Sequence, residues 1–129
     1  MSGPRFLYNF TAPRLGVELP TQEVLDMITV LFYATVKEGN VQTFHDHVVR
    51  LTAITRAEDE GCLTYVFHQR QDNPREFMLY EQWRDEAALD AHVAHCQAVF
   101  GPPGPNGRLP LALSGLCDDI HRVRYEVVA

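Results

Sequence analysis

The chain has 129 residues, 46% of them apolar and 22% charged, which is typical of one globular domain with one hydrophobic core. Its formal net charge of -6 argues against nucleic acid or an anionic membrane as partner, because both attract basic surfaces. No apolar run approaches the roughly 20 residues of a membrane-spanning helix. Cys62, Cys96 and Cys117 show no paired spacing, so we expect free thiols and a cytoplasmic protein.

The first part of the chain differs from the rest. Residues 1–26 contain three prolines and show no sustained hydrophobic periodicity, apart from one helical turn that residues 21–26 can form. We interpret 1–26 as an N-terminal extension and 27–129 as the domain.

Strands and amphipathic helices alternate within the domain. Runs rich in β-branched and aromatic residues predict strands at 27–36, 62–69, 77–83 and 120–128. Apolar residues at helical spacing predict one helix from Val41 to before Gly61, with Asn40 as N-cap, and a second helix capped by Asp85. A Gly- and Pro-rich loop at 101–107 and a short helical piece within 109–116 follow. This order predicts an α+β, ferredoxin-like βαββαβ fold with a four-stranded antiparallel sheet and both helices on one face.

Both faces of the predicted sheet are apolar. In the first strand Val30 and Phe32 alternate with Leu31 and Tyr33, so each face receives large apolar side chains. Two helices can cover only one face, and a second copy of the sheet is the simplest cover for the other. We therefore expect a homodimer packed sheet to sheet.

The second helix carries a histidine within its apolar stripe. His92 is flanked by Leu89, Val93 and Cys96 and should point at the sheet, either as a hydrogen-bonded core residue or as a functional one. His92, His95 and Cys96 could share a ligand on one helix face, but no partner with convincing spacing occurs elsewhere. No cofactor-binding glycine loop is present either, so we expect neither metal nor cofactor.

The third strand carries an acidic residue on an apolar face. Glu81 and Trp83 alternate onto the same face as Phe77 and Leu79. A carboxylate that enters the interior needs a partner or a changed protonation state, so Glu81 is either a structural residue or part of a pocket. His92, Glu81, Trp83 and Tyr65 could line one such pocket.

Three motifs carry a resemblance to a known family. They are the runs Gly61-Cys62-Leu63-Thr64-Tyr65, Tyr80-Glu81-Gln82-Trp83 with the following Asp85, and Ala88-Leu89-Asp90-Ala91-His92. The chain resembles the antibiotic biosynthesis monooxygenase domain, and the order of its elements agrees. The resemblance implies a dimeric α/β barrel built from two ferredoxin-like subunits. The haem-degrading members have an Asn on the first strand, which this sequence lacks.

The resemblance implies a cofactor-independent monooxygenase that oxidises a quinol, anthrone or similar electron-rich aromatic with O2. We assign His92 as the base, with Glu81 and Tyr65 as further catalytic residues that orient a hydroxyl. The residues expected to bind the aromatic substrate are Trp83, Phe32, Phe44 and His45. Two alternatives stay open at this point. One is an isomerase of a small phosphorylated metabolite, for which Arg122 or Arg124 on the last strand could supply one or two cationic groups, and the other is a non-catalytic small-molecule-binding module.

Overall fold

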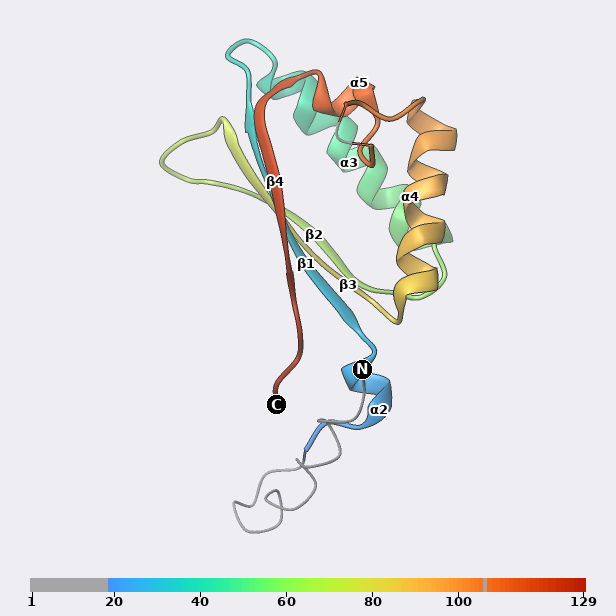
Figure 1. The fold of residues 1–129 in the computed structure, drawn as a ribbon. Coiled ribbons are helices and arrows are strands. Elements are labelled where there is room, and N and C mark those ends of the chain that lie inside the picture. The colour runs from blue at the N-terminus through green and yellow to red at the C-terminus, as the bar shows by residue number, and fades with distance from the viewer. Residues whose placement is uncertain (1–18, 106) are drawn as a thin grey trace.

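The computed structural model describes residues 19–105 and 107–129, so residues 1–18 of the predicted extension lie outside the described range. The elements are α2 (Gln22–Leu25), β1 (Ile28–Val36), α3 (Val41–Glu58), β2 (Cys62–Gln69), β3 (Glu76–Trp83), α4 (Glu86–Phe100), α5 (Leu111–Ser114) and β4 (Cys117–Tyr125). The strands form an antiparallel sheet in the order β2-β3-β1-β4. Helices α3 and α4 lie together on one side of this sheet (Figure 1). The predicted α+β, ferredoxin-like fold is confirmed.

The last strand is the element whose predicted bounds are wrong. It begins at Cys117 and ends at Tyr125, whereas the sequence pattern placed it at 120–128. Asp118 and Asp119 have low strand propensity, but backbone pairing with β1 outweighs it, with Asp119 opposite Thr35. A register irregularity then brings Cys117 opposite Val36.

The helix ends follow the predicted caps in part. The side chain of Asp85 accepts a hydrogen bond from the Ala88 N–H at 2.9 Å and caps α4 as predicted. Asn40 stands at the N-cap of α3 but makes no side-chain capping bond. Helix α3 ends at Glu58, and Gly61, with φ of 85°, turns the chain into β2. Among the described residues, no helix is both long and apolar enough to cross a bilayer.

The hydrophobic core lies between the helices and one face of the sheet. The largest side chains that are fully buried there include Trp83, Phe44, Leu89 and Leu113. Val30 and Phe32 of β1 point into this core, and Glu81 and Trp83 of β3 share the same face, as alternation predicts. The carboxylate of Glu81 is therefore inside, with only 6% of the residue exposed.

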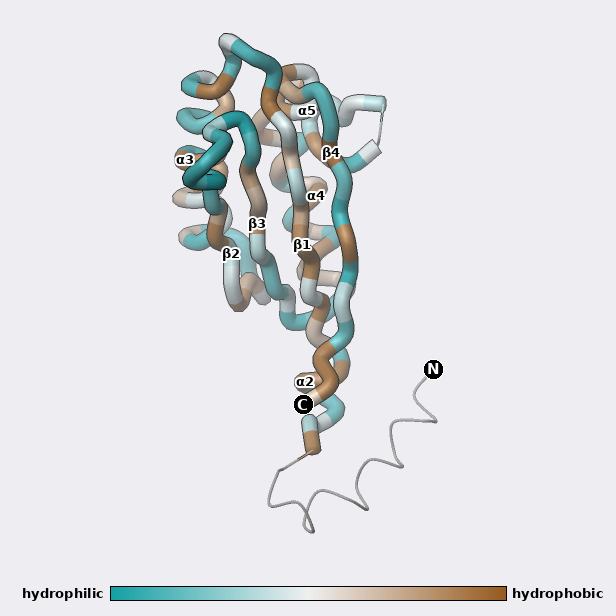
Figure 2. Tube along the Cα trace, turned by 90° about the vertical axis from the view of Figure 1, so that its left-hand side faces the viewer, coloured by the Kyte–Doolittle hydropathy of each residue, from teal (hydrophilic) through white to brown (hydrophobic). Residues whose placement is uncertain are grey.

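The opposite face of the sheet carries a second apolar surface. Leu31 at its centre is paired in register with Tyr80 on one side and Val123 on the other. Tyr33 and Met78 lie on the same face one pair further along. Figure 2 looks onto this open face, with β2, β3, β1 and β4 in front and the helices behind. In the single chain these side chains are half-buried or exposed.

Gly61 combines a positive φ with a close approach of α4, so it tolerates a side chain poorly. A Cβ there would lie 2.6 Å from the Cβ of Ala88, whereas a Cβ at Gly39, which also has positive φ, meets nothing within 4 Å. We expect Gly39→Ala to cost about 1–2 kcal/mol of unfolding free energy from φ strain alone. Gly61→Ala should cost about 2–4 kcal/mol, because the clash adds to that strain. Urea denaturation of both variants measures the difference, and equal losses would show that the α4 contact does not matter.

Candidate functional site

A cavity of about 390 Å³ lies between α4, the loop that follows it, and the strands β1, β3 and β4 of the sheet. Its apolar lining consists of Phe32, Leu89, Val93, Leu109 and Ile120. Its polar and charged lining includes Glu81, His92, Cys96, Arg108 and Arg122. A mostly apolar cavity with a few convergent polar groups is the usual form of a small-molecule site.

His92 projects from α4 into the interior and is only 5% exposed. Its Nδ1 lies 2.5 Å from Oδ2 of Asp59, the residue that follows the last turn of α3. Because a carboxylate can only accept, Nδ1 donates the proton, and the neutral form of the imidazole then has its lone pair on Nε2. Nε2 lies 3.4 Å from Sγ of Cys96, which lines the cavity. The ring therefore presents a proton acceptor toward the cavity.

Asp59 holds a second histidine with its other oxygen. Its Oδ1 accepts from Nδ1 of His95 at 2.6 Å, while Nε2 of His95 lies 3.5 Å from Glu58. The Asp59 side chain is 7% exposed and that of His95 is 30% exposed. Two N–H donors thus satisfy a nearly buried carboxylate, which offsets the cost of removing it from water.

Glu81 and Trp83 form a second hydrogen-bonded pair beside His92. The indole Nε1 donates to Oε1 of Glu81 at 2.8 Å, and the Trp83 and His92 rings lie 4.5 Å apart at 33°. Burial raises the pKa of Glu81, while the hydrogen bond from Trp83 and the nearby His92 and Arg122 oppose this rise. Trp83 itself is completely buried and packs against the ring of His92.

Tyr65 lies next to His92, with ring centroids 5.2 Å apart, and is only 3% exposed. It is not among the residues that line the cavity. Burial, and then the charge of Glu81, raises the pKa of Tyr65 well above its usual value, so the phenol stays neutral. Tyr65 therefore forms part of the packing around the histidine.

Cys96 is a protonated thiol. Burial and the charges of Asp59 and Glu81 raise its pKa to about 12. A nucleophilic cysteine needs the thiolate, and this environment disfavours it. The contact between Sγ and His92 therefore involves a thiol and not a thiolate.

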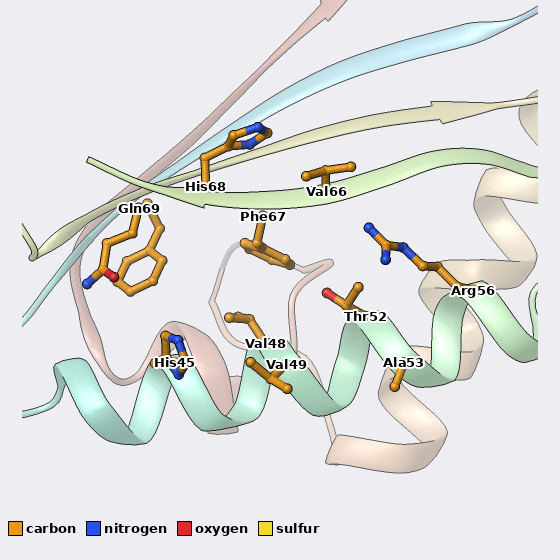
Figure 3. Close-up of a pocket in the computed structure, with 11 residues that line it drawn as sticks. His45, Val48, Val49, Thr52, Ala53, Arg56, Val66, Phe67, His68 and Gln69 are labelled. Carbon is orange, nitrogen blue, oxygen red and sulfur yellow. The ribbon is translucent and has the colours of Figure 1, made fainter. Parts of the chain in front are cut away.

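The other predicted substrate-binding residues separate into two places. Phe32 lines the cavity described above. Phe44 is 1% exposed and packs in the core, with its ring 4.9 Å from that of Phe77. His45 lines a different cavity of about 400 Å³ between α3 and the edge strand β2, opposite His68 and Phe67 (Figure 3). The structure thus brings Phe32, but not Phe44 or His45, together with His92.

Two residues of the site were missed by sequence reasoning. Asp59 belongs to the acidic run Glu58-Asp59-Glu60, which looks like a solvated helix end, and its pairing with α4 has no local signal. Arg108 lies in a loop, where no periodicity applies. Arg122, which the isomerase alternative already named as a possible cation, lies in the cavity on the same face of β4 as Ile120.

No group of three or more His, Cys, Asp or Glu in the described part of the chain is arranged to hold a metal ion. The two histidines that the sequence suggests could share a ligand with Cys96 have another partner in the structure. Both histidines instead direct Nδ1 at Asp59.

Comparison with known proteins agrees with this fold. The family model described as antibiotic biosynthesis monooxygenase matches residues 27–98, and the chain belongs to that family. An uncharacterized protein of Synechocystis sp. is 28% identical over 60 residues, which are 42% of this chain and 41% of the relative. The match thus spans less than half of that relative's length.

Solved structures share the fold over nearly their whole length. A conserved protein from Methanosarcina mazei Go1 is 28% identical with a TM-score of 0.64, covering 81% of this chain and 96% of that one. A structure named antibiotic biosynthesis monooxygenase is 24% identical with a TM-score of 0.66, covering 79% and 99%. At that identity the second likeness supports the fold alone.

The raised pKa of Glu81 generates a prediction about stability. Glu81 has a higher pKa in the folded state than in the unfolded state. Its carboxyl therefore lowers the unfolding free energy as pH rises through the folded-state pKa, and it has no such effect below the unfolded-state pKa. Glu81→Gln keeps an acceptor for Trp83 but removes the charge. The unfolding free energy of Glu81→Gln relative to the parent should therefore increase from about pH 4 to about pH 7. Urea denaturation measures it, and a difference independent of pH would contradict the shift.

Proposed function

We propose that this family member oxidises a quinol, anthrone or similar electron-rich aromatic with O2 and needs no cofactor. The observation that carries the proposal is His92, whose Nδ1 is held by Asp59 and whose Nε2 faces the cavity. A phenol has a pKa of about 10, so a protein base must assist its deprotonation at neutral pH. An imidazole with one nitrogen fixed on a carboxylate is well suited to that task.

The chemistry follows from deprotonation. His92 Nε2 accepts the hydroxyl proton, and the electron-rich anion passes one electron to O2. The substrate radical and superoxide then combine to form a carbon–oxygen bond, giving a peroxide anion that takes back the proton held by His92. The resulting hydroperoxide breaks its O–O bond, and the departing hydroxide leaves as water with the hydrogen of the same carbon. One oxygen atom remains in the product as a carbonyl and the other becomes water, so atoms and electrons balance.

The cavity wall supports an aromatic substrate. Phe32 and Leu89 offer apolar surface to a ring, and aromatic contacts add to simple burial. Glu81 lines the same cavity and can accept from a second hydroxyl when ionised, which fits the orienting role expected for it. The roles expected for Trp83 and Tyr65 become indirect, since both pack against the His92 ring.

We propose further that the protein is a homodimer in which a second copy covers the open sheet face. The support is the apolar surface centred on Leu31, Tyr80 and Val123, which no helix of the described residues covers. Burying apolar surface of this kind favours association at about 25 cal/mol per Å². Such a dimer would close the barrel that the family resemblance implies.

Oxygen consumption tests the catalytic proposal. Metal-stripped protein should consume O2 with hydroquinones or anthrones, and His92→Ala should lower kcat by about 10²–10⁴-fold. Asp59→Asn should also lower kcat, because an amide at this position can stabilise the opposite tautomer of His92. An oxygen electrode measures both.

His47→Ala provides a matched control. His47 lies on α3, half-buried, with its ring edge toward Phe100 and away from the cavity. Its substitution should leave oxygen uptake unchanged. If the parent protein consumes no oxygen across the panel, the proposal fails, and an isomerase or a binding module becomes the better reading. If His92→Ala retains more than about a third of the rate, His92 is not the base.

The proposed dimer makes its own prediction. Leu31→Asp puts a charge at the centre of the open face and should give a monomer, because an unpaired charge is costly in an apolar interface. Val49→Asp is the control, since Val49 is 56% exposed on α3, away from the open face. Light scattering at micromolar protein reports the mass. A monomeric parent protein, or a dimer that survives Leu31→Asp, would rule out this interface.

A further inference from the structure

Two arginines line the same cavity as His92. Arg108 comes from the loop that follows α4, and Arg122 comes from β4, where it is paired in register with Phe32. Arg124 lies two residues further along the strand but outside the cavity, with its guanidinium 2.6 Å from Glu86 at the surface. The two cavity arginines therefore form a positive wall beside an apolar pocket.

The charge of this wall is only partly cancelled within the chain. Arg122 makes no ion pair with any residue in 19–105 or 107–129, and the nearest carboxylate oxygen to Arg108 is that of Asp90 at 3.9 Å. Burial lowers the pKa of Arg122, and the positive charge of Arg108 lowers it further, while Glu81 opposes them. The repulsion between two neighbouring positive charges is relieved by an anion that binds between them.

We infer that the substrate of this site carries an anionic group on its aromatic ring, and that Arg108 and Arg122 bind that group. The inference rests on the proposed function for the reacting part of the molecule. The anion lies at the arginine wall, the ring lies against Phe32 and Leu89, and the phenolic hydroxyl reaches His92. The substrate class is thus a hydroxylated aromatic acid.

The recognition chemistry favours this class over a neutral quinol. Guanidinium groups bind carboxylates and phosphates through charge-assisted hydrogen bonds, often two at once, and these fix orientation as well as affinity. A neutral quinol would offer neither cation an anionic partner. An anchored anion would also hold the ring so that one hydroxyl faces the base. This orientation lowers the entropic part of the activation barrier for the reaction.

Calorimetric titration under anaerobic conditions tests the inference without turnover. The probes are 2,5-dihydroxybenzoate and its amide, which share ring and hydroxyl groups but differ in charge. The carboxylate should bind about tenfold more tightly or better, as expected for charge-assisted hydrogen bonds. Arg122→Gln and Arg108→Gln should each reduce this preference, and Glu81→Gln, which removes a negative charge from the same wall, should increase it.

Arg124→Gln is the matched control and should keep the full preference, because Arg124 does not line the cavity. Titration with phenyl phosphate then shows whether the two arginines bind a phosphate in place of a carboxylate. Binding of either anion that depends on Arg122 supports the inference. Equal binding of acid and amide, or a preference that survives Arg122→Gln, overturns it. Arg122-dependent binding without oxygen uptake would leave the anion site standing and refute only the monooxygenase proposal.

Discussion

The site depends on one carboxylate. Asp59 stands just beyond the end of α3 and accepts hydrogen bonds from His92 and His95 of α4. These bonds join the two helices that cover the sheet, and they also decide which nitrogen of His92 carries the proton. Removing Asp59 would leave two imidazoles without their acceptor in a nearly buried place, so packing and chemistry rest on the same contact.

The turn around Asp59 explains why this contact forms. Helix α3 ends at Glu58, and Gly61 adopts a positive φ that reverses the chain into β2 within two residues. The absence of a side chain at Gly61 lets α4 approach closely at Ala88, one turn before His92. The Gly-Cys motif of the family and its Ala-Leu-x-x-His motif therefore meet in space, although they are far apart in the sequence. The glycine is needed for the approach that brings His92 to Asp59.

Periodicity alone predicted the sheet, both helices and the inward side chain of His92, because each element buries one face. It placed Glu81 and Trp83 on one face of β3 but did not decide whether that face is the inner one. It missed Asp59 and Arg108, which lie at a helix end and in a loop, where facing is set by tertiary contacts. It also assigned Phe44 and His45 to the substrate site because they lie on a helix that covers the sheet, without considering how far along the helix they lie. Phe44 and His45 begin α3, far along the helix from the end that meets His92.

The central claim is that Asp59 holds His92 as the Nδ1-protonated tautomer, with an unprotonated Nε2 beside Cys96 at the cavity. Nitrogen-15 NMR of the histidine rings measures this directly in the resting protein, with His92→Gln used to assign the signals. The account predicts a protonated Nδ1 and an unprotonated Nε2 for His92, and loss of that preference in Asp59→Asn. A His92 ring that carries its proton on Nε2 in the parent protein would contradict the account.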